Sequence, residues 1–286
     1  MNQFAIEIKN LNVKLGRFAL RDITFGVETG TIMGFIGKNG AGKTTLIKTM
    51  MDVLRPSSGT VLFDGIPMCD NEEIVKSKIG VVYDSLIFPP NMKGKKIVRL
   101  LAPFYNNFDM ELWSKLMARF ELDENAKIAS FSKGMQMRFS IIMALAQKPE
   151  ILILDEPTAG LDPTARVEVL ELLQEFIQDE NKTIFFSTNI TTDLDKIADV
   201  ITLIDKGEII FSEEKEKLLD LYAVVRIDRE SITDEMKQNL SGLRENTFGF
   251  EGMCSDKTLF ENNPGVKIAR PTVEDIMVYK GGLEGD

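Results

Sequence analysis

The sequence contains no histidine, a single tryptophan and only two cysteines among its 286 residues. No imidazole is therefore available anywhere in the chain, and this absence matters for one motif below. The cysteines, Cys69 and Cys254, lie far apart without a Cys-x-x-Cys pair, so we expect free thiols in a reducing compartment. No apolar run approaches the length of a membrane-spanning helix, and the N-terminus alternates like a strand, unlike a secretory leader. We therefore expect a soluble cytosolic protein whose membrane role, if any, comes through a partner.

Positive charge is also scarce in this chain. It has 34 Lys and Arg residues against 44 Asp and Glu residues, a formal net charge of −10. An acidic balance argues against a nucleic-acid groove as the main partner surface. The length allows one large domain, or one domain with an appendage, and the apolar content suffices for a core.

Apolar runs and helical patterns alternate along the first part of the chain, which predicts an α/β fold with a largely parallel sheet. Residues 4–36 alternate like strands and predict an N-terminal antiparallel β-subdomain. Residues about 90–150 read as a helical insertion, in which Trp113 and Leu116 begin one apolar helix face. Further strands are expected at residues 61–63, 79–82, 151–154, 183–187, 200–204 and 208–211, and a helix at about 163–179.

The pattern weakens after about residue 222. A strand at 224–227, a helix near 231–241 and the Phe248-Gly249-Phe250 segment predict a small C-terminal α+β appendage. We therefore expect two domains, one over residues 1–222 and a small accessory domain over residues 223–286.

One octet is the most specific feature of the chain. Residues 37–44 read Gly-Lys-Asn-Gly-Ala-Gly-Lys-Thr, which fits the phosphate-loop pattern G-x-x-x-x-G-K-[ST] without a mismatch. A buried strand is expected just before it and a helix just after it. Strand, glycine loop and helix together aim free backbone N–H groups at a polyphosphate, so we predict a P-loop NTPase core.

Each position of the octet has an expected role. Gly37, Gly40 and Gly42 let the backbone adopt positive φ and approach the phosphates closely. Lys43 is expected to neutralise the β and γ phosphates, and the Thr44 hydroxyl to bind Mg²⁺. The residues expected to contact nucleotide in this segment are Asn39, Gly40, Ala41, Gly42, Lys43, Thr44 and Thr45.

A second motif ends the apolar strand at 151–154 with Asp155 and Glu156. Asp155 is expected to hold Mg²⁺, directly or through water, and Glu156 to act as the general base on the attacking water. An Asp-Glu pair after a strand is a weak signal by itself. A complete phosphate loop earlier in the chain makes it a strong one.

A third motif runs from Phe131 to Gln136. Ser132 can cap the following helix, and Gly134 leaves the backbone N–H groups of the helix start exposed, which gives a second anion-binding helix start. The other interpretation is an ordinary capped helix, which spacing alone favours.

The order of these motifs resembles the ATP-binding subunit of an ABC transporter. The resemblance covers roughly residues 4–222 and rests on residues 37–44, 132–136, 151–158 and Ala-Gly-Leu-Asp at 159–162. It implies ATP and Mg²⁺ as cofactors. It also implies two subunits head to tail, with Ser132, Gly134 and Gln136 of one completing the nucleotide site of the other. The second subunit is a second copy of this chain or a paralogue.

The resemblance also implies partners and a place in the cell. The helical insertion resembles the part that docks on an integral membrane subunit, so the chain is expected peripherally at the cytoplasmic face of the membrane, without nucleic acid. Ser-Lys-Gly-Met at 132–135 resembles a branch of bacterial exporters with separate membrane subunits, of the drug or peptide efflux type. A basic cluster follows the Asp84 loop and is expected at the docking surface, although a solvated helix face is an equal alternative; it consists of Lys93, Lys95, Lys96 and Arg99.

Four positions depart from the family. In the signature segment, Phe131, Lys133 and Met135 differ from the common form, whereas Ser132 and Gly134 remain. The aromatic that stacks on the base is missing near Leu15, and Phe18 is the nearest substitute. Asp84 stands where a glutamine is expected, and it can still contact Mg²⁺ or its waters. Asn189 stands where the switch histidine is expected to contact the γ-phosphate, and we expect it to act there as a catalytic residue. Asparagine can donate a neutral hydrogen bond but cannot carry charge, and charge-assisted bonds are roughly twice as strong.

Asn189 therefore has two interpretations, natural drift in a tolerant subfamily or a site that hydrolyses ATP slowly. Other functions also remain open: a soluble ATPase of the same family, or a slow nucleotide switch without a membrane partner.

Overall fold

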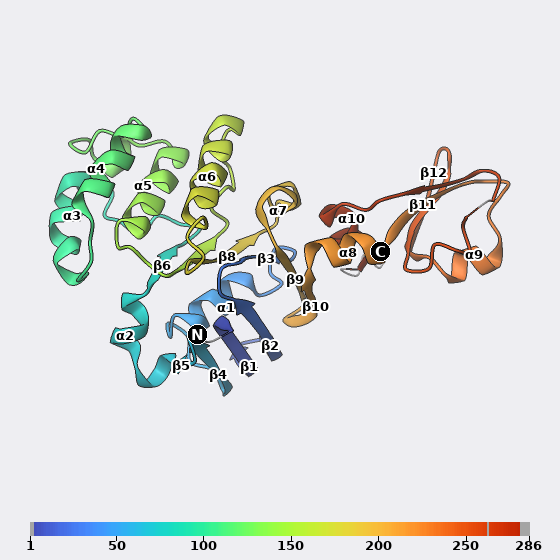
Figure 1. Ribbon diagram of the computed structural model, residues 1–286, viewed down its shortest axis with the longest axis horizontal. Coiled ribbons are helices and arrows are strands. Elements are labelled where there is room, and N and C mark those ends of the chain that lie inside the picture. The colour runs from blue at the N-terminus through green and yellow to red at the C-terminus, as the bar shows by residue number, and fades with distance from the viewer. Residues whose placement is uncertain (1–2, 262, 281–286) are drawn as a thin grey trace.

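The computed structural model describes residues 3–261 and 263–280. Figure 1 shows three parts in a row, with helices α3 to α6 at one end, the N-terminal and central sheets in the middle and a C-terminal domain at the other end. The predicted fold class is confirmed, because a mixed α/β core carries an N-terminal antiparallel sheet, a helical insertion and a C-terminal α+β appendage.

The N-terminal sheet is antiparallel, with the strand order β2-β1-β4-β5. Alternate residues of its strands are buried, because the sheet packs one face against the core and leaves the other to solvent. Its strands are β1 (Phe4–Leu15), β2 (Phe18–Glu28), β4 (Ser58–Phe63) and β5 (Ile66–Pro67).

The central sheet has six strands in the order β10-β9-β3-β8-β7-β6, parallel except for β10 at one edge. Its strands are β3 (Ile32–Ile36), β6 (Ile79–Val82), β7 (Ile151–Asp155), β8 (Thr183–Thr188), β9 (Val200–Asp205) and β10 (Glu208–Glu214). Every residue of β3, β7 and β8 is buried, which explains the apolar runs of β3 and β7 and the Ile184-Phe185-Phe186 run of β8. Parallel strands end at the same edge, so the segments that follow β3, β7 and β8 meet there.

Ten α-helices lie in the described ranges, and four of them, α2, α7, α8 and α10, were not predicted. The buried side chains of Trp113, Leu116, Met117 and Phe120 confirm the expected apolar face of α4. The helices are α1 (Lys43–Met50), α2 (Glu72–Ser77), α3 (Gly94–Leu101), α4 (Met110–Arg119), α5 (Lys133–Leu145), α6 (Pro163–Phe176), α7 (Thr191–Ile197), α8 (Lys215–Leu221), α9 (Asp234–Gln238) and α10 (Val273–Lys280). Three short 3₁₀ turns occur at Met68–Asp70, Ala102–Phe104 and Ile128–Ser130.

The C-terminal domain is a second antiparallel sheet with its own small core. Its strands follow the order β12-β13-β11-β14: β11 (Ala223–Asp228), β12 (Ser241–Asn246), β13 (Gly249–Cys254) and β14 (Val266–Ala269). The helix expected at 231–241 is only α9, because β12 begins directly after it. The last six residues of the predicted accessory domain, 281–286, lie outside the described residues.

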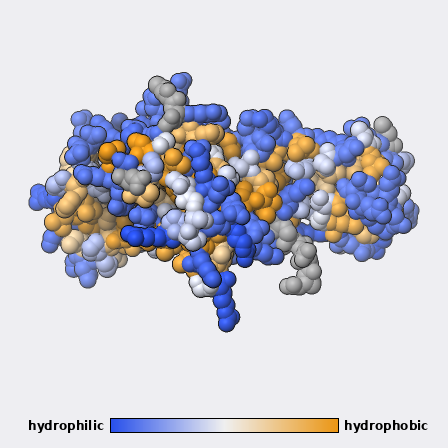
Figure 2. All heavy atoms as spheres, turned by 90° about the horizontal axis from the view of Figure 1, so that it is seen from below, coloured by the Kyte–Doolittle hydropathy of each residue, from blue (hydrophilic) through white to orange (hydrophobic). Residues whose placement is uncertain are grey.

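The surface is mostly hydrophilic. On the face shown in Figure 2, apolar residues form separate patches, one of them at the end formed by the helical insertion. None of the helices within residues 3–261 and 263–280 has the length and apolarity that crossing a bilayer requires.

Candidate functional site

The phosphate loop connects β3 to α1 and uses its glycines in two different ways. Gly40 and Gly42 have φ angles of 81° and 120°, which glycine adopts without strain. Gly37 does not have the positive φ that we expected. A Cβ there would lie 2.5 Å from the carbonyl oxygen of Ile204, so Gly37 is required by close backbone packing against β9.

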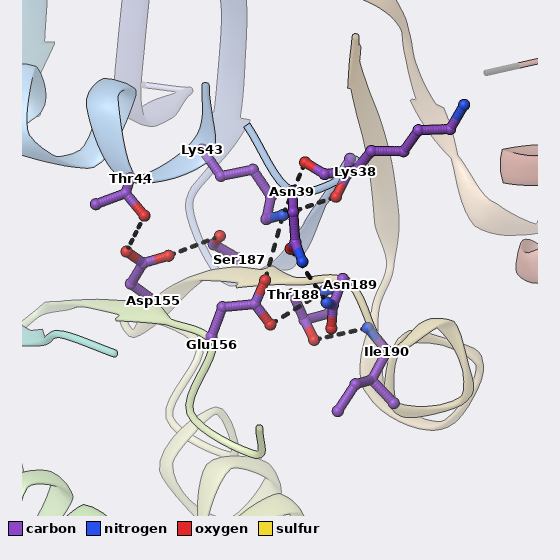
Figure 3. A network of polar contacts seen from close by, with 11 residues as sticks. Lys38, Asn39, Lys43, Thr44, Asp155, Glu156, Ser187, Thr188, Asn189 and Ile190 are labelled. Atoms are coloured by element: carbon purple, nitrogen blue, oxygen red, sulfur yellow. Dashed lines mark hydrogen bonds and ion pairs between the residues drawn. The ribbon is translucent and has the colours of Figure 1, made fainter. Parts of the chain in front are cut away.

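Lys43 is the first residue of α1, and its side chain is almost fully buried. Its Nζ donates a hydrogen bond to the Gly37 carbonyl at 2.7 Å. The same Nζ forms an ion pair with Glu156 Oε1 at 3.2 Å (Figure 3). The lysine therefore lies inside the loop, with its charge directed at the carboxylate that follows β7.

Glu156 is held in place from several sides. Its backbone N–H donates to the Ser187 carbonyl at 2.8 Å, and its Oε2 accepts from the backbone N–H of Asn189 at 3.1 Å. Its φ angle is 51°, in the left-handed region that few non-glycine residues occupy. Strain of this kind is found at functional sites, where the surrounding contacts maintain it.

Asp155 is fully buried at the end of β7 and accepts two hydroxyl hydrogen bonds. Thr44 Oγ1 donates to Oδ2 at 2.7 Å, and Ser187 Oγ donates to Oδ1 at 3.0 Å. Burial raises the pKa of Asp155; the two hydroxyls act in the opposite direction, and the charges of Asp84 and Glu156 raise it again.

The donor atoms around Asp155 suit Mg²⁺. A Thr hydroxyl and a carboxylate lie together, and both are hard oxygen ligands. Mg²⁺ in nucleotide sites takes only one or two protein carboxylates and completes its coordination with phosphates and water. Consistently, the described part of the chain has no cluster of three or more acidic or cysteine side chains that could hold an ion alone.

Asn189 follows β8 and lies against the phosphate loop. Its Nδ2 donates to Asn39 Oδ1 at 3.4 Å, as Figure 3 shows. Asn189 therefore contacts the phosphate loop through its side chain, and it contacts Glu156 through its backbone N–H. This position allows it to respond to a phosphate bound between them.

A cavity of about 540 Å³ lies elsewhere, beside β6, whereas the cavity at the phosphate loop measures about 520 Å³. Phe18, Leu15 and Asp84 are part of the wall of the cavity at the phosphate loop. The lining residues are Leu15, Phe18, Lys38, Asn39, Gly40, Gly42, Lys43, Thr44, Thr45, Asp84 and Glu156. Ala41 is different, because its side chain is in the core and its N–H donates to the Lys38 carbonyl.

The start of α5 does not line this cavity. Ser132 caps the helix as predicted, accepting from the Met135 N–H at 3.2 Å. Gly134 is a buried residue, and a Cβ there would lie 3.6 Å from Leu161 Cδ2, an ordinary contact distance. The Gln136 amide donates to the Phe131 carbonyl at 3.0 Å and so holds the preceding loop.

The sequence did not identify Ser187 as a site residue. It is the penultimate residue of β8, beside β7, and therefore faces Asp155. Its only sequence signal is its place at the end of a buried strand next to the one that carries the Asp-Glu pair.

Comparison with known proteins agrees with this geometry. A family model described as "ABC transporter" matches residues 20–159. The ABC transporter ATP-binding protein NatA of Bacillus subtilis (strain 168) is 33% identical over 211 residues, covering 71% of this chain and 84% of that protein. The bacitracin transport ATP-binding protein BcrA of Enterococcus faecalis is 33% identical over 211 residues, covering 73% of this chain and 68% of that protein. A solved dimeric structure of a bacterial ABC transporter cassette is 25% identical with a TM-score of 0.65, covering 73% of this chain and 98% of that chain.

Proposed function

This chain belongs to the ABC transporter family of ATP-binding proteins, and from that premise we propose how it works as an ATP-driven transporter subunit. It binds ATP with Mg²⁺ at the phosphate-loop cavity, dimerises on the nucleotide and powers export through a separate membrane subunit. One observation supports the dimer above all. The chain has two helix starts suited to anions, and only one of them, at α1, lines the cavity.

Binding depends on the loop between β3 and α1. Its backbone N–H groups and the start of α1 surround the β and γ phosphates, and Lys43 supplies positive charge there. Thr44 and Asp155 hold Mg²⁺, which neutralises the phosphate charge, and Asp84 is close enough to contact its waters. Phe18 offers an apolar surface for the base.

Hydrolysis depends on Glu156. Its carboxylate accepts a hydrogen bond from a water molecule in line with the γ-phosphorus, and takes up a proton as the new P–O bond forms and the bond to the β-phosphate oxygen breaks. The products are ADP and inorganic phosphate. Lys43 and Asn189 stabilise the charge on the transferred group, Asn189 through a neutral amide.

The second helix start completes the site of another cassette. Ser132, Gly134 and Gln136 are at or next to the start of α5 and do not line the phosphate-loop cavity of their own chain. In a head-to-tail pair, Ser132 and the N–H groups of this turn contact the γ-phosphate held by the other chain. The dimeric cassette structure that this chain resembles supports such a pair.

The larger cavity, of about 540 Å³, gives a place for the membrane subunit. It is an apolar groove between β6, the Ile87 segment and α3, and we call it the docking groove. Leu100 and Ile87 on its rim are 50% and 60% exposed. Lys96 and Arg99 lie beside it on the exposed side of α3, while Lys95 pairs with Glu124 at 2.5 Å. A membrane subunit in this groove holds the chain at the cytoplasmic face. The name of the relative from Enterococcus faecalis supports a drug or peptide substrate.

Dimer formation tests this proposal directly. In the Glu156→Gln variant, ATP with Mg²⁺ should convert monomer to dimer in light scattering, because bound ATP is no longer cleaved. The same variant with Lys43→Ala should stay monomeric. A Glu156→Gln chain that remains monomeric at saturating ATP, even with the membrane subunit present, would refute the shared site. Affinity purification from membranes, with and without charge reversal at Lys96 and Arg99, then tests the docking groove.

Asn189 favours a second candidate, a slow nucleotide switch. The contacts that bind ATP do not depend on residue 189. An asparagine there stabilises the charge on the transferred phosphate less well than an imidazolium would. A turnover rate that stays low in the presence of the membrane subunit would favour the switch.

A further inference from the structure

Helix α7 links the catalytic segments to the C-terminal domain. It begins at Thr191, two residues after Asn189, and Asn189 directly follows the last residue of β8. On one side it contacts the segments that carry Glu156 and the start of α6, and on the other it packs against α10. Figure 1 shows α7 and α10 between the core and the C-terminal sheet.

The catalytic side of α7 is fixed by a buried carboxylate. Asp193 is fully buried, and its Oδ2 accepts from Thr158 Oγ1 at 2.6 Å. Its Oδ1 accepts from Arg166 Nε at 2.5 Å, and Arg166 also donates to Thr192 Oγ1. Thr158 is two residues after Glu156. The position of α7 is therefore coupled to the segment that holds the general base.

The other side of α7 receives the first turn of α10. The backbone N–H of Val273 donates to Asp195 Oδ1 at 3.2 Å, so a residue of α7 satisfies an N–H that the helix start leaves without a partner. Val273 and Ile276 are each only 1% exposed. They belong to the same buried apolar cluster as Leu194 and Ile197 of α7.

α10 is in turn attached to the accessory sheet. Tyr279 donates its hydroxyl to Glu251 of β13 at 2.7 Å, and Glu251 pairs with Arg226 of β11. Arg270, just before α10, pairs with Glu216 of α8 at 2.7 Å. The helix cannot shift without moving the sheet.

We infer that the accessory domain positions the catalytic residues through α7, with Asp195 as the positioning residue on α7 that α10 engages. Through α7, the domain fixes the position of Asn189, which lies just before this helix. It also fixes Glu156, because Asp193 of α7 binds Thr158, two residues after Glu156. The inference rests on the proposed ATP hydrolysis, and it assigns a role in turnover to residues 223–280. Nucleotide binding depends on the phosphate loop, so we expect the affinity for ATP to be independent of α10.

The chain offers a matched pair of variants. Asp195→Ala removes the acceptor of an α10 N–H at 3.2 Å, and Thr233→Ala removes the acceptor of the Met236 N–H, also at 3.2 Å, at the start of α9. Both weaken a helix start of the accessory domain, but only the first touches α7. We expect Asp195→Ala to lower kcat for phosphate release roughly 3- to 10-fold with the KM for ATP within about twofold. Thr233→Ala should change neither. Asp195→Asn keeps an oxygen acceptor and should restore the rate.

Hydrogen exchange gives a readout that needs no turnover. Without nucleotide, amides of residues 156–158 and 189–197 should exchange faster in Asp195→Ala than in Thr233→Ala. Equal rates and equal exchange in the two variants would overturn the inference. If the unmodified chain shows no ATPase activity, the proposed function fails, whereas the exchange comparison still decides whether α10 controls α7.

Discussion

Replacing Asn189 with histidine introduces the only imidazole in the chain, at the position that contacts the phosphate loop. Asn189 Nδ2 lies 3.4 Å from Asn39 Oδ1, so a side chain at this position reaches the rim of the nucleotide cavity. Its backbone N–H, which holds Glu156, is unaffected by the substitution. The variant therefore changes the charge beside the γ-phosphate and leaves the general base in place.

The size of the effect follows from the distance. A unit positive charge about 4 Å from the phosphate contributes about 4 kcal/mol at an effective dielectric constant of about 20. Most of this attraction exists already in bound ATP and does not accelerate the reaction. If about one third is specific to the transition state, the gain is about 1.4 kcal/mol, or roughly tenfold in kcat.

Phosphate release measured between pH 6 and 8 provides the assay. Only the protonated imidazole carries the charge, and its pKa is normally about 6.5. The gain of Asn189→His over the unmodified chain should therefore increase as the pH falls through this range. Because the chain has no other histidine, a single imidazole resonance reports the protonation state in the same sample.

Two controls separate charge from shape. Asn189→Ala removes the donor and should lower kcat, and Asn189→Gln keeps an amide and should not gain rate at low pH. An Asn189→His variant that is protonated by NMR yet turns over at the rate of the unmodified chain would refute the role of residue 189.

Three further predictions concern the same region. Lys43→Ala should weaken ATP binding roughly 10- to 100-fold in titrations with a fluorescent nucleotide, because it removes one charge-assisted contact, and unchanged affinity would remove Lys43 from the site. Asp155 has a folded-state pKa above its usual 3.8, so ionising it costs stability as the pH rises from about 4 through that raised value. Asp155→Asn should therefore raise the melting temperature of the nucleotide-free chain at pH 7, with a smaller gain near pH 4. The same variant should lose Mg²⁺-dependent turnover. A lower melting temperature at pH 7 would contradict the stability prediction. Arg166→Ala leaves the Asp193 charge buried without its ion-pair partner and should cost about 3 kcal/mol in urea unfolding, of which adding Asp193→Asn should recover a large part.

Much of the fold was predictable because its signals are local. Apolar runs marked β3 and β7 as buried strands of a largely parallel sheet, and parallel strands end at one edge of the sheet. The octet at 37–44 and the pair Asp155 and Glu156 then had to meet there, and the ion pair between Lys43 and Glu156 shows that they do.

The remainder depends on contacts between distant segments. Gly37 is required by the carbonyl of Ile204, which no pattern around residue 37 reveals. Gly134 is covered by Leu161 from another helix start. The contact between Asp195 and Val273 joins two short helices that were not predicted, because each is stabilised by tertiary packing more than by its own sequence.

The ion pair between Lys43 and Glu156 places an anion of the chain itself against the lysine of the phosphate loop. In the proposed reaction, a phosphate that binds Lys43 displaces this carboxylate and frees it to act on water. Phosphate binding and release of the Glu156 carboxylate are then the same event, in which one anion replaces another at Lys43. Because Glu156 offsets the charge of Lys43, we expect this lysine to bind small anions weakly when they lack the many contacts of a nucleotide.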